Sequence, residues 1–321
     1  MTFYDVFNGD ADGICALQQL RLQAPRESVL ITGLKREIDL LKRVNAKKGD
    51  DICVLDISLD KNRDALIKVL DTGATVFYAD HHFAGEIPTH ENLELHIDPA
   101  SDTCTSLIVN QHLNGQQAHW AVVGAYGDNF DPVAEQLGRS IGLDDTSLEQ
   151  YRQLGICLNY NGYGFEIEDL MHHPADLFVL LNAYQNPLEF IRNEPGYARL
   201  LEQYKTDMAL SKSTKPEAQA DSAAVYLLPN ESWAKRIVGV MGNDLAQQNP
   251  QRAHALLVDM GDGHYRVSVR APYSTKSGAD ELCRQFESGG GRQAAAGINQ
   301  LPEAELVRFV AKFEQSFEGA L

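Results

Sequence analysis

The most informative residues of this chain are Asp80, His81 and His82, which directly follow the apolar run from Ala74 to Ala79. A run that is typical of a buried strand has no structural need for three polar side chains that can bind a metal ion. One imidazole could ligate a cation while the other contacts a phosphate, and Asp80 could orient a histidine from behind. An isolated His-His pair is more often part of a polar loop, so the prediction of a metal site depends on further ligands.

Further ligands stand where other strand-like runs end. The first run, Phe3–Phe7, is followed by Asn8, Asp10 and Asp12, and Asp56 lies in the run from Ile52 to Ile57. Carboxylate and amide oxygens suit Mg²⁺ or Mn²⁺. The alternative for each position is an ordinary turn or helix N-cap, where Asp and Asn are also common.

Asp128 is the fourth candidate, because it follows the apolar helical run from Ala118 to Tyr126. A simple loop aspartate is the alternative. Together the four sites supply four aspartates as candidate ligands, one or two histidines and an asparagine, with Asp80 behind a histidine. This set matches the ligands of a two-metal phosphoesterase, in which ions about 3.5–4 Å apart activate water, hold the phosphoryl group and stabilise the leaving oxygen.

A second cluster is rich in glycine and arginine. Gly289, Gly290 and Gly291 precede Arg292 and the small residues Ala294–Gly297. We expect a helix after the glycines, whose exposed N–H groups would bind an anion together with the guanidinium of Arg292. Arg270 ends a strand-like run and could face the same place, although an ordinary loop and a structural ion pair are the alternatives.

The elements that must position these residues alternate between strand and helix up to about residue 115. This alternation predicts a doubly wound, mainly parallel α/β sheet. Lys35 and Arg36 follow the second strand near the same edge, where ordinary surface charges are the more common outcome. The expected strands are Phe3–Phe7, Val29–Leu34, Ile52–Ile57, Thr75–Ala79 and Leu93–Ile97, and the expected helices are Ile14–Gln23, Ile38–Val44, Arg63–Leu70 and Ser106–Leu113.

The pattern becomes helical from about 117 to 213, and the polar stretch 211–222 reads as a linker. Strands and helices then alternate in a smaller α+β domain. We therefore expect a catalytic domain over 1–190, a helical connector and linker over 191–222, and a substrate-binding domain over 223–321.

Charge and composition limit the function. The net charge is −17, which argues against a long basic tract for nucleic acid because such binding depends on many Lys and Arg contacts to phosphate. Five cysteines without a CxxC pair, no signal-peptide pattern and no membrane-length apolar run predict a reduced cytoplasmic protein. The oligomeric state stays open, with a homodimer as one option.

With these residues in place, the chain resembles the DHH phosphoesterase superfamily. The amino-terminal part is similar to the DHH domain, and the glycine-rich segment resembles the GGGHxxAAG motif of the DHH-associated carboxy-terminal domain. The resemblance covers nearly the whole chain. It implies hydrolysis of phosphate esters with two Mn²⁺ or Mg²⁺ ions, as in RecJ-type exonucleases, oligoribonucleases and phosphatases of 3′-phosphoadenosine 5′-phosphate.

The resemblance also implies individual roles. Asp10 and Asp56 would bind one ion with Asn8, and His82 would assist phosphate binding. The other ion would take Asp12, Asp56, His81 and Asp128 as ligands. In the second domain, Arg270, Gly289, Gly290, Gly291 and Arg292 would hold the end of the substrate.

Two departures from the family pattern concern Asn8, which stands where relatives often have Asp or His, and Arg292, which replaces the motif histidine. The leading hypothesis is a metal-dependent phosphoesterase acting on short oligonucleotides, with Asp56, His81 and His82 in catalysis. The alternatives are a small-nucleotide phosphatase, a cyclic-dinucleotide phosphodiesterase, or a non-catalytic nucleotide-binding module.

Overall fold

The computed structural model describes residues 1–318 and divides into two compact units, with the division between Glu202 and Gln203. This point lies within helix α9 (Pro195–Ser213) and inside the connector expected at 191–222. The functional roles expected of the two domains stay predictions. No helix among the described residues is long and apolar enough to cross a membrane.

The first unit contains a five-stranded, entirely parallel sheet with the strand order β2-β1-β3-β4-β5. The predicted doubly wound parallel sheet is therefore confirmed. Strand β2 is shorter than expected, because it ends at Ile31 rather than Leu34. The strands are β1 (Phe3–Phe7), β2 (Val29–Ile31), β3 (Asp51–Leu55), β4 (Thr75–Asp80) and β5 (Leu93–Ile97).

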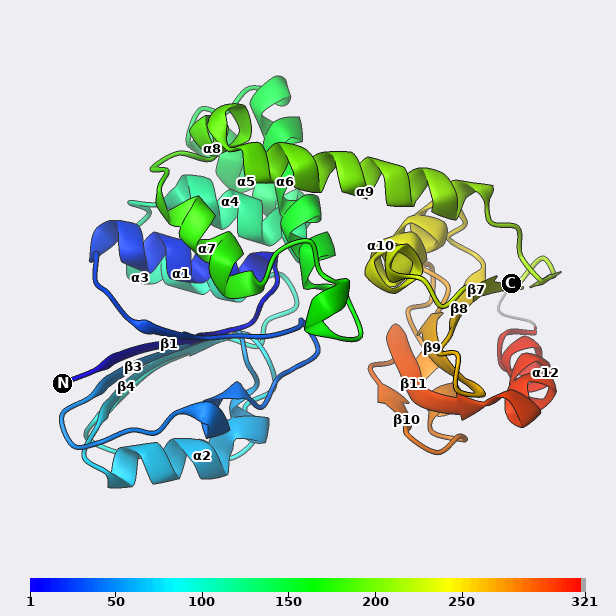
Figure 1. The fold of residues 1–321 in the computed structure, drawn as a ribbon, viewed down its shortest axis with the longest axis horizontal. Coiled ribbons are helices and arrows are strands. Elements are labelled where there is room, and N and C mark those ends of the chain that lie inside the picture. Colours follow the sequence, from blue (N-terminus) through cyan, green and yellow to red (C-terminus); the bar gives the residue numbers. More distant parts are fainter. Residues whose placement is uncertain (319–321) are drawn as a thin grey trace. The chain divides into compact units, whose positions relative to one another are not determined.

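Helices cover both faces of this sheet (Figure 1). Helix α2 (Leu59–Asp71) lies on one face, where Leu66 and Val69 join a buried cluster with the strands. The opposite face carries α1 (Ala11–Gln23), α3 (Thr105–His112) and α4 (Ala118–Gly127). The remaining helical segments of this unit are η1 (Leu40–Arg43), α5 (Asp131–Ser140), α6 (Asp145–Gly162), η2 (Ile167–Asp169), α7 (Pro174–Asn182) and α8 (Pro187–Asn193).

The second unit is built on a mixed six-stranded sheet with the order β10-β11-β9-β8-β7-β6. Among the described strands of this second unit, only β7 and β8 pair in parallel. The strands are β6 (Ala218–Gln219), β7 (Ala223–Leu228), β8 (Ala253–Asp259), β9 (His264–Arg270), β10 (Gly289–Gly291) and β11 (Ala295–Pro302). The helical segments are α10 (Ser232–Gln248), α11 (Ala279–Cys283), η3 (Glu303–Glu305) and α12 (Leu306–Phe317). The predicted α+β class of this part is confirmed.

The core of the second unit forms because α12 repeats an aromatic residue every fourth position. Phe309, Phe313 and Phe317 are all buried and belong to the same apolar cluster as Ala255 and Leu257 of β8. Since successive side chains of a strand point to opposite faces, His254 of β8 lies on the other face of the sheet. It is fully buried there.

One expectation for this unit was wrong. The small residues after the glycines form strand β11 and not a helix, because Ala295–Ile298 pair with Val267–Arg270 of β9. Pairing in a sheet overrides the intrinsic helix preference of alanine. The expected linker also contributes strand β6, which pairs with β7.

Candidate metal centre

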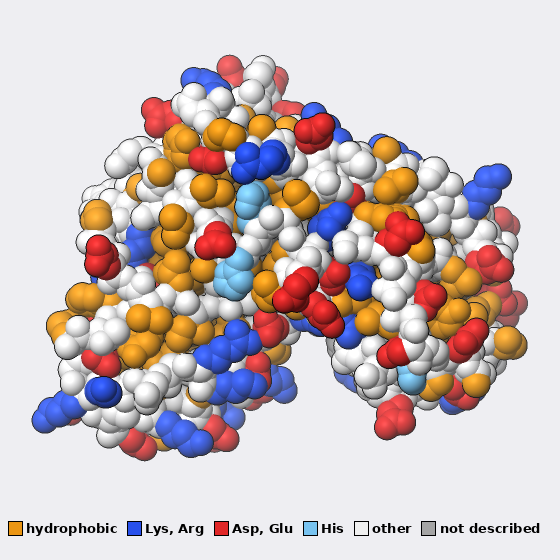
Figure 2. All heavy atoms as spheres, viewed as in Figure 1, with side chains coloured by type: hydrophobic (Ala, Val, Ile, Leu, Met, Phe, Trp, Pro, Cys, Tyr) orange, Lys and Arg blue, Asp and Glu red, His pale blue; other side chains and the backbone are white. Residues whose placement is uncertain are grey.

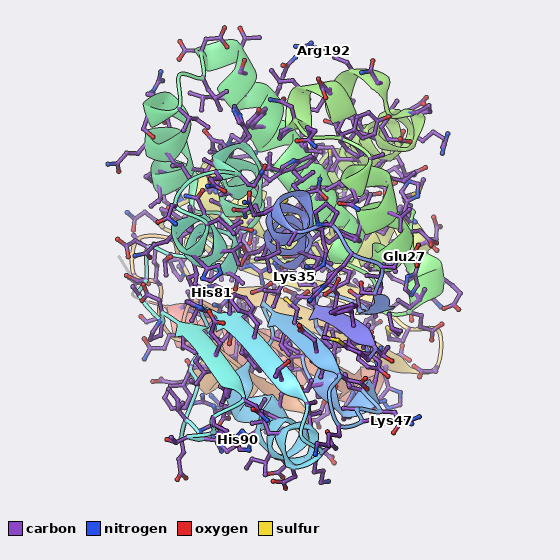
Figure 3. All side chains as sticks on the ribbon, turned by 90° about the vertical axis from the view of Figure 1, so that its left-hand side faces the viewer. Glu27, Lys35, Lys47, His81, His90 and Arg192 are labelled. Atoms are coloured by element: carbon purple, nitrogen blue, oxygen red, sulfur yellow. The ribbon has the colours of Figure 1, made fainter. Side chains whose placement is uncertain are left out.

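Three neighbouring strands bring the predicted residues to one edge of the parallel sheet. Strands β1, β3 and β4 lie side by side with Phe7, Leu55 and Ala79 in register. The segments that begin at Asn8, Asp56 and Asp80 therefore leave the sheet at the same end, which is where open α/β sheets bind ligands. Figure 3 shows Lys35 and His81 at the border between this sheet and the helical layer.

His81 presents one ring nitrogen to a group of carboxylates. Its Nδ1 lies 3.1 Å from the carbonyl oxygen of Thr103, an arrangement in which Nδ1–H donates to that carbonyl. Nε2 lies 3.5 Å from Asp56 Oδ1 and 3.6 Å from Asp128 Oδ2. A backbone carbonyl behind one ring nitrogen is the arrangement that orients metal-binding histidines.

Asp56 has an unusual backbone conformation at this edge. Its φ of 57° lies in the left-handed region, which non-glycine residues rarely occupy except Asn and Asp. The side chain is buried, and Oδ1 accepts a hydrogen bond of 3.1 Å from the hydroxyl of Thr105. Burial and the neighbouring carboxylates of Asp12 and Asp10 raise the pKa of Asp56 well above its usual value.

The two aspartates after β1 each cap a helix. Asp10 is the N-cap of α1, because its Oδ1 accepts from the backbone N–H groups of Asp12 and Gly13, both at 3.1 Å. Asp12 caps a different helix, α3, and its two oxygens accept from the N–H groups of Thr105 at 2.8 Å and Ser106 at 2.7 Å. Burial also raises the pKa of Asp12 above its usual value. The alternative of an N-cap is thus true of Asp10, and it does not prevent the carboxylate from facing the centre.

Asp80 contacts the other histidine of the triplet. Its Oδ1 lies 2.7 Å from Nδ1 of His82, and His82 is more exposed than His81. Burial lowers the pKa of His82, but the hydrogen bond to Asp80 and the nearby carboxylates outweigh it and raise that pKa above its usual value. The geometry is that of an imidazole held in place by the carboxylate behind it.

Lys35 is the residue whose place sequence reasoning missed. Its Nζ lies 2.6 Å from Asp10 Oδ2, 3.2 Å from Asp128 Oδ1 and 2.8 Å from Asn159 Oδ1 of helix α6. Burial lowers the pKa of Lys35, but Asp10 and Asp128 raise it well above its usual value, so the ammonium group is charged. The sequence indicated the position of Lys35 only weakly, because the one sign was that Lys35 follows the second expected strand.

Asn8 is oriented away from the role that was expected of it. Its amide nitrogen donates to the carbonyl oxygen of Lys35 at 3.1 Å, and its Oδ1 accepts from the N–H of Asp10 at 3.2 Å. Both ends of the side chain therefore hold the backbone around the centre. Its role as a metal ligand stays a prediction that this geometry does not favour.

The donor set around His81 fits a divalent cation. Two groups each offer three ligand atoms within 4.8 Å of one another, and His81 belongs to both. They are Asp12, His81 and Asp128, and Asp56, His81 and His82. Burial is the largest cause of the raised pKa values of Asp12 and Asp56, and neighbouring carboxylates raise both values further. A cation at this place would stabilise the charged forms.

Among the described residues, one further group of this kind lies away from the centre. Glu94 and His96 of β5 and His112 of α3 place their ligand atoms within 4.8 Å, but Glu94 is 59% exposed. The short contact in this group is the 2.8 Å pair between Glu94 and His96.

In the second unit, Arg270 and the glycines lie on nearby strands. Arg270 pairs with Ala295 of β11, and β11 pairs in turn with β10. The guanidinium of Arg270 donates to Asn243 Oδ1 and Ser268 Oγ, both at 2.9 Å. Arg292 is exposed in the turn between β10 and β11.

Two of the three glycines of β10, Gly289 and Gly291, lie where the backbone leaves no room for a Cβ. A Cβ on Gly289 would lie 1.8 Å from the carbonyl oxygen of Cys283, and Gly291 has a φ of 140°. A Cβ on Gly290 would meet nothing within 4 Å, so this position is open on its side-chain side. The predicted substrate-binding roles of these residues stay predictions.

The two sheets and the carboxylate-histidine edge define an α/β protein with a second α+β unit and a candidate metal centre. Residues 221–319 match the DHHA1 domain. No curated protein sequence gives a significant match. The predicted resemblance to the DHH phosphoesterase superfamily is confirmed by this match together with the structural similarities that follow.

The chain is similar in fold to three solved structures. Manganese-bound exonuclease RecJ is 17% identical with a TM-score of 0.64, and the match covers 98% of this chain and 89% of that one. RecJ from Thermus thermophilus in complex with Mn²⁺ is 18% identical with a TM-score of 0.65, over 98% of this chain and 51% of that one. The pGpG-specific phosphodiesterase PggH of Vibrio cholerae is 15% identical with a TM-score of 0.59, over 98% and 99%.

Proposed function

We propose that this protein is a metal-dependent phosphoesterase that hydrolyses phosphodiester bonds of short oligonucleotides. The observation that carries the proposal is the position of His81 Nε2, which lies within 3.6 Å of carboxylate oxygens from both Asp56 and Asp128. The other side of this imidazole is bonded to a carbonyl, and burial raises the pKa of the Asp56 carboxyl that it faces. Such an arrangement is typical of a histidine that binds a metal ion.

Asp12, Asp56, His81 and Asp128 would hold the divalent ion. When bound, Mn²⁺ or Mg²⁺ supplies Lewis-acid polarisation of the phosphate and makes water a better nucleophile. Thr105 donates to Asp56 and thereby fixes one carboxylate oxygen. Asp80 holds His82 with its Nε2 directed away from that hydrogen bond, so His82 can donate to a phosphate oxygen.

The preference for short substrates rests on charge. With a net charge of −17, the chain has few cations for a long polyanion. On the face shown in Figure 2, Lys and Arg side chains are interspersed with acidic ones. PggH, which has a similar fold, is named as specific for pGpG, and RecJ is named as an exonuclease. We therefore place dinucleotides first among the substrates to test.

The test is a screen of the purified protein for hydrolysis in the presence of Mn²⁺ or Mg²⁺. Substrates are pGpG, 5′-labelled RNA and DNA from dinucleotides upward, 3′-phosphoadenosine 5′-phosphate and cyclic dinucleotides. We expect metal-dependent release of mononucleotides, fastest with the shortest RNA or DNA. Release of inorganic phosphate alone would replace the proposal with a small-nucleotide phosphatase, and nucleotide binding without turnover would replace it with a binding module.

A further inference from the structure

We propose that the ammonium group of Lys35 takes the place of one of the two divalent ions that the family resemblance implies. The centre would then bind a single ion beside a permanent positive charge of the chain itself. This inference deepens the proposed function and rests on it for its chemical meaning, but the number of bound ions can be measured without any turnover.

The first argument is that Lys35 is fully engaged by three oxygen atoms. An ammonium group has three N–H donors. The oxygens of Asp10, Asn159 and Asp128 lie 2.6, 2.8 and 3.2 Å from Nζ, one for each donor. Oxygens from three separate segments therefore surround the ammonium group as they would surround a cation, and an ion at this place would have to displace it.

Asp128 lies between Lys35 and His81, which we call the two halves of the centre. Its Oδ1 faces the ammonium of Lys35 at 3.2 Å, while its Oδ2 faces Nε2 of His81 at 3.6 Å. A carboxylate that joins two cations is the usual link of a two-ion centre. Here one side of that link is already occupied by Lys35.

Both carboxylate oxygens of Asp10 already accept hydrogen bonds from groups of the protein. Oδ1 accepts the N–H groups of Asp12 and Gly13 as the N-cap of α1, and Oδ2 accepts from Lys35. Burial raises the pKa of Asp10, but Lys35 more than offsets this effect and lowers it below the usual value. The carboxylate is therefore charged and already neutralised by a group of the protein.

Asn8 holds the backbone segment that carries Lys35. The amide nitrogen of Asn8 donates to the backbone carbonyl of Lys35 at 3.1 Å. An aspartate could not donate this hydrogen bond. Asn8 is thus a positioning residue for the segment that carries Lys35, and its neutral side chain leaves less negative charge for a second ion.

The experiment counts Mn²⁺ ions on the full-length protein by equilibrium dialysis and records the electron paramagnetic resonance spectrum of the same samples. Every protein carries His112→Gln, so that Glu94, His96 and His112 cannot add to the count. We expect one tightly bound ion with the spectrum of an isolated Mn²⁺. The double variant Asn8→Asp/Lys35→Ala should bind two ions with a spin-coupled spectrum, since paired ions lie about 3.5–4 Å apart.

Lys35→Met is the single-site variant, and Lys42→Met is its matched control because Lys42 is 62% exposed. Lys35→Met should gain affinity for a second ion, whereas Lys42→Met should keep one. Two tightly bound, coupled ions in the protein with Lys35 intact would overturn the inference, even where the Lys35 variants fail to fold. One ion without hydrolysis of any substrate would contradict the proposed function and leave this inference standing.

Discussion

The half of the centre around His81 and the half around Lys35 both contain aspartates, but their carboxylates have different partners. Around His81, oxygen atoms of Asp56 and Asp128 lie near Nε2, and burial together with neighbouring carboxylates raises the pKa values of Asp12 and Asp56. Around Lys35, the pKa of Asp10 is lowered because an ammonium group already neutralises it. The number of carboxylates alone therefore does not determine how many ions a site binds.

The comparison also shows how helix caps prepare the site. Asp10 and Asp12 are two residues apart, yet they cap α1 and α3 respectively. These backbone hydrogen bonds hold each carboxylate in one direction before any ion binds. The two carboxylates differ in that Asp10 also accepts from Lys35.

Removing the carboxylate of Asp56 should have the largest effect. Asp56→Asn keeps a residue that tolerates a φ of 57° but removes the charge that faces His81. Since a metal ion supplies several kcal/mol of charge stabilisation, we expect kcat to fall on the order of 10³-fold. Initial rates with a short RNA measure this. Asp71→Asn, at an exposed position of α2, is the control and should keep full activity.

His81→Gln tests the half that is proposed to bind the ion. Residues that hydrogen-bond to metal ligands contribute about 10- to 100-fold in metal affinity. Loss of a ligand itself should therefore weaken Mn²⁺ binding by at least about 100-fold. Isothermal titration with Mn²⁺ gives the affinity. His264→Gln, in the second unit, should bind as the wild type does. Equal affinity in His81→Gln would place the ion elsewhere.

Asp80→Asn tests the support of His82 and should have an intermediate effect. Removing the carboxylate lowers the pKa of His82, so the protonated form is lost at a lower pH as pH rises. We expect kcat to fall about 10-fold and the alkaline limb of its pH profile to move to lower pH. A purely structural role would lower activity without moving the profile.

The smallest expected effect is on stability and concerns His254, which, unlike His81, has no hydrogen-bond partner among the described residues. Burial lowers the pKa of His254 to about 4. The unfolded chain therefore binds a proton at His254 more readily than the folded chain as pH falls from about 6.5 to 4, which lowers stability in that range. Between pH 7 and 5 the loss should be about 1–2 kcal/mol.

Urea unfolding of the wild type and His254→Leu at both pH values measures this loss. The variant should lose less stability on acidification, because leucine takes up no proton. An identical loss in both proteins would assign the acid sensitivity to other groups.

Sequence alone predicted the parallel sheet, the second α+β domain and which residues gather at the edge, because strand ends in a parallel sheet follow from local patterns. It could not place Lys35 or Asn159, since their positions depend on how a loop and helix α6 pack against the strands. It also mistook β11 for a helix. The pairing of Ala295 with Arg270 of β9 decides that segment, and the local composition does not reveal it.

The most direct test of the central claim is Mn²⁺-dependent hydrolysis of pGpG and 5′-labelled dinucleotides by the wild type, Asp56→Asn and Asp71→Asn. We predict turnover by the wild type and Asp71→Asn, and its loss in Asp56→Asn and on removal of metal. Metal-independent hydrolysis, or equal turnover by Asp56→Asn, would contradict a catalytic metal centre at this edge of the sheet.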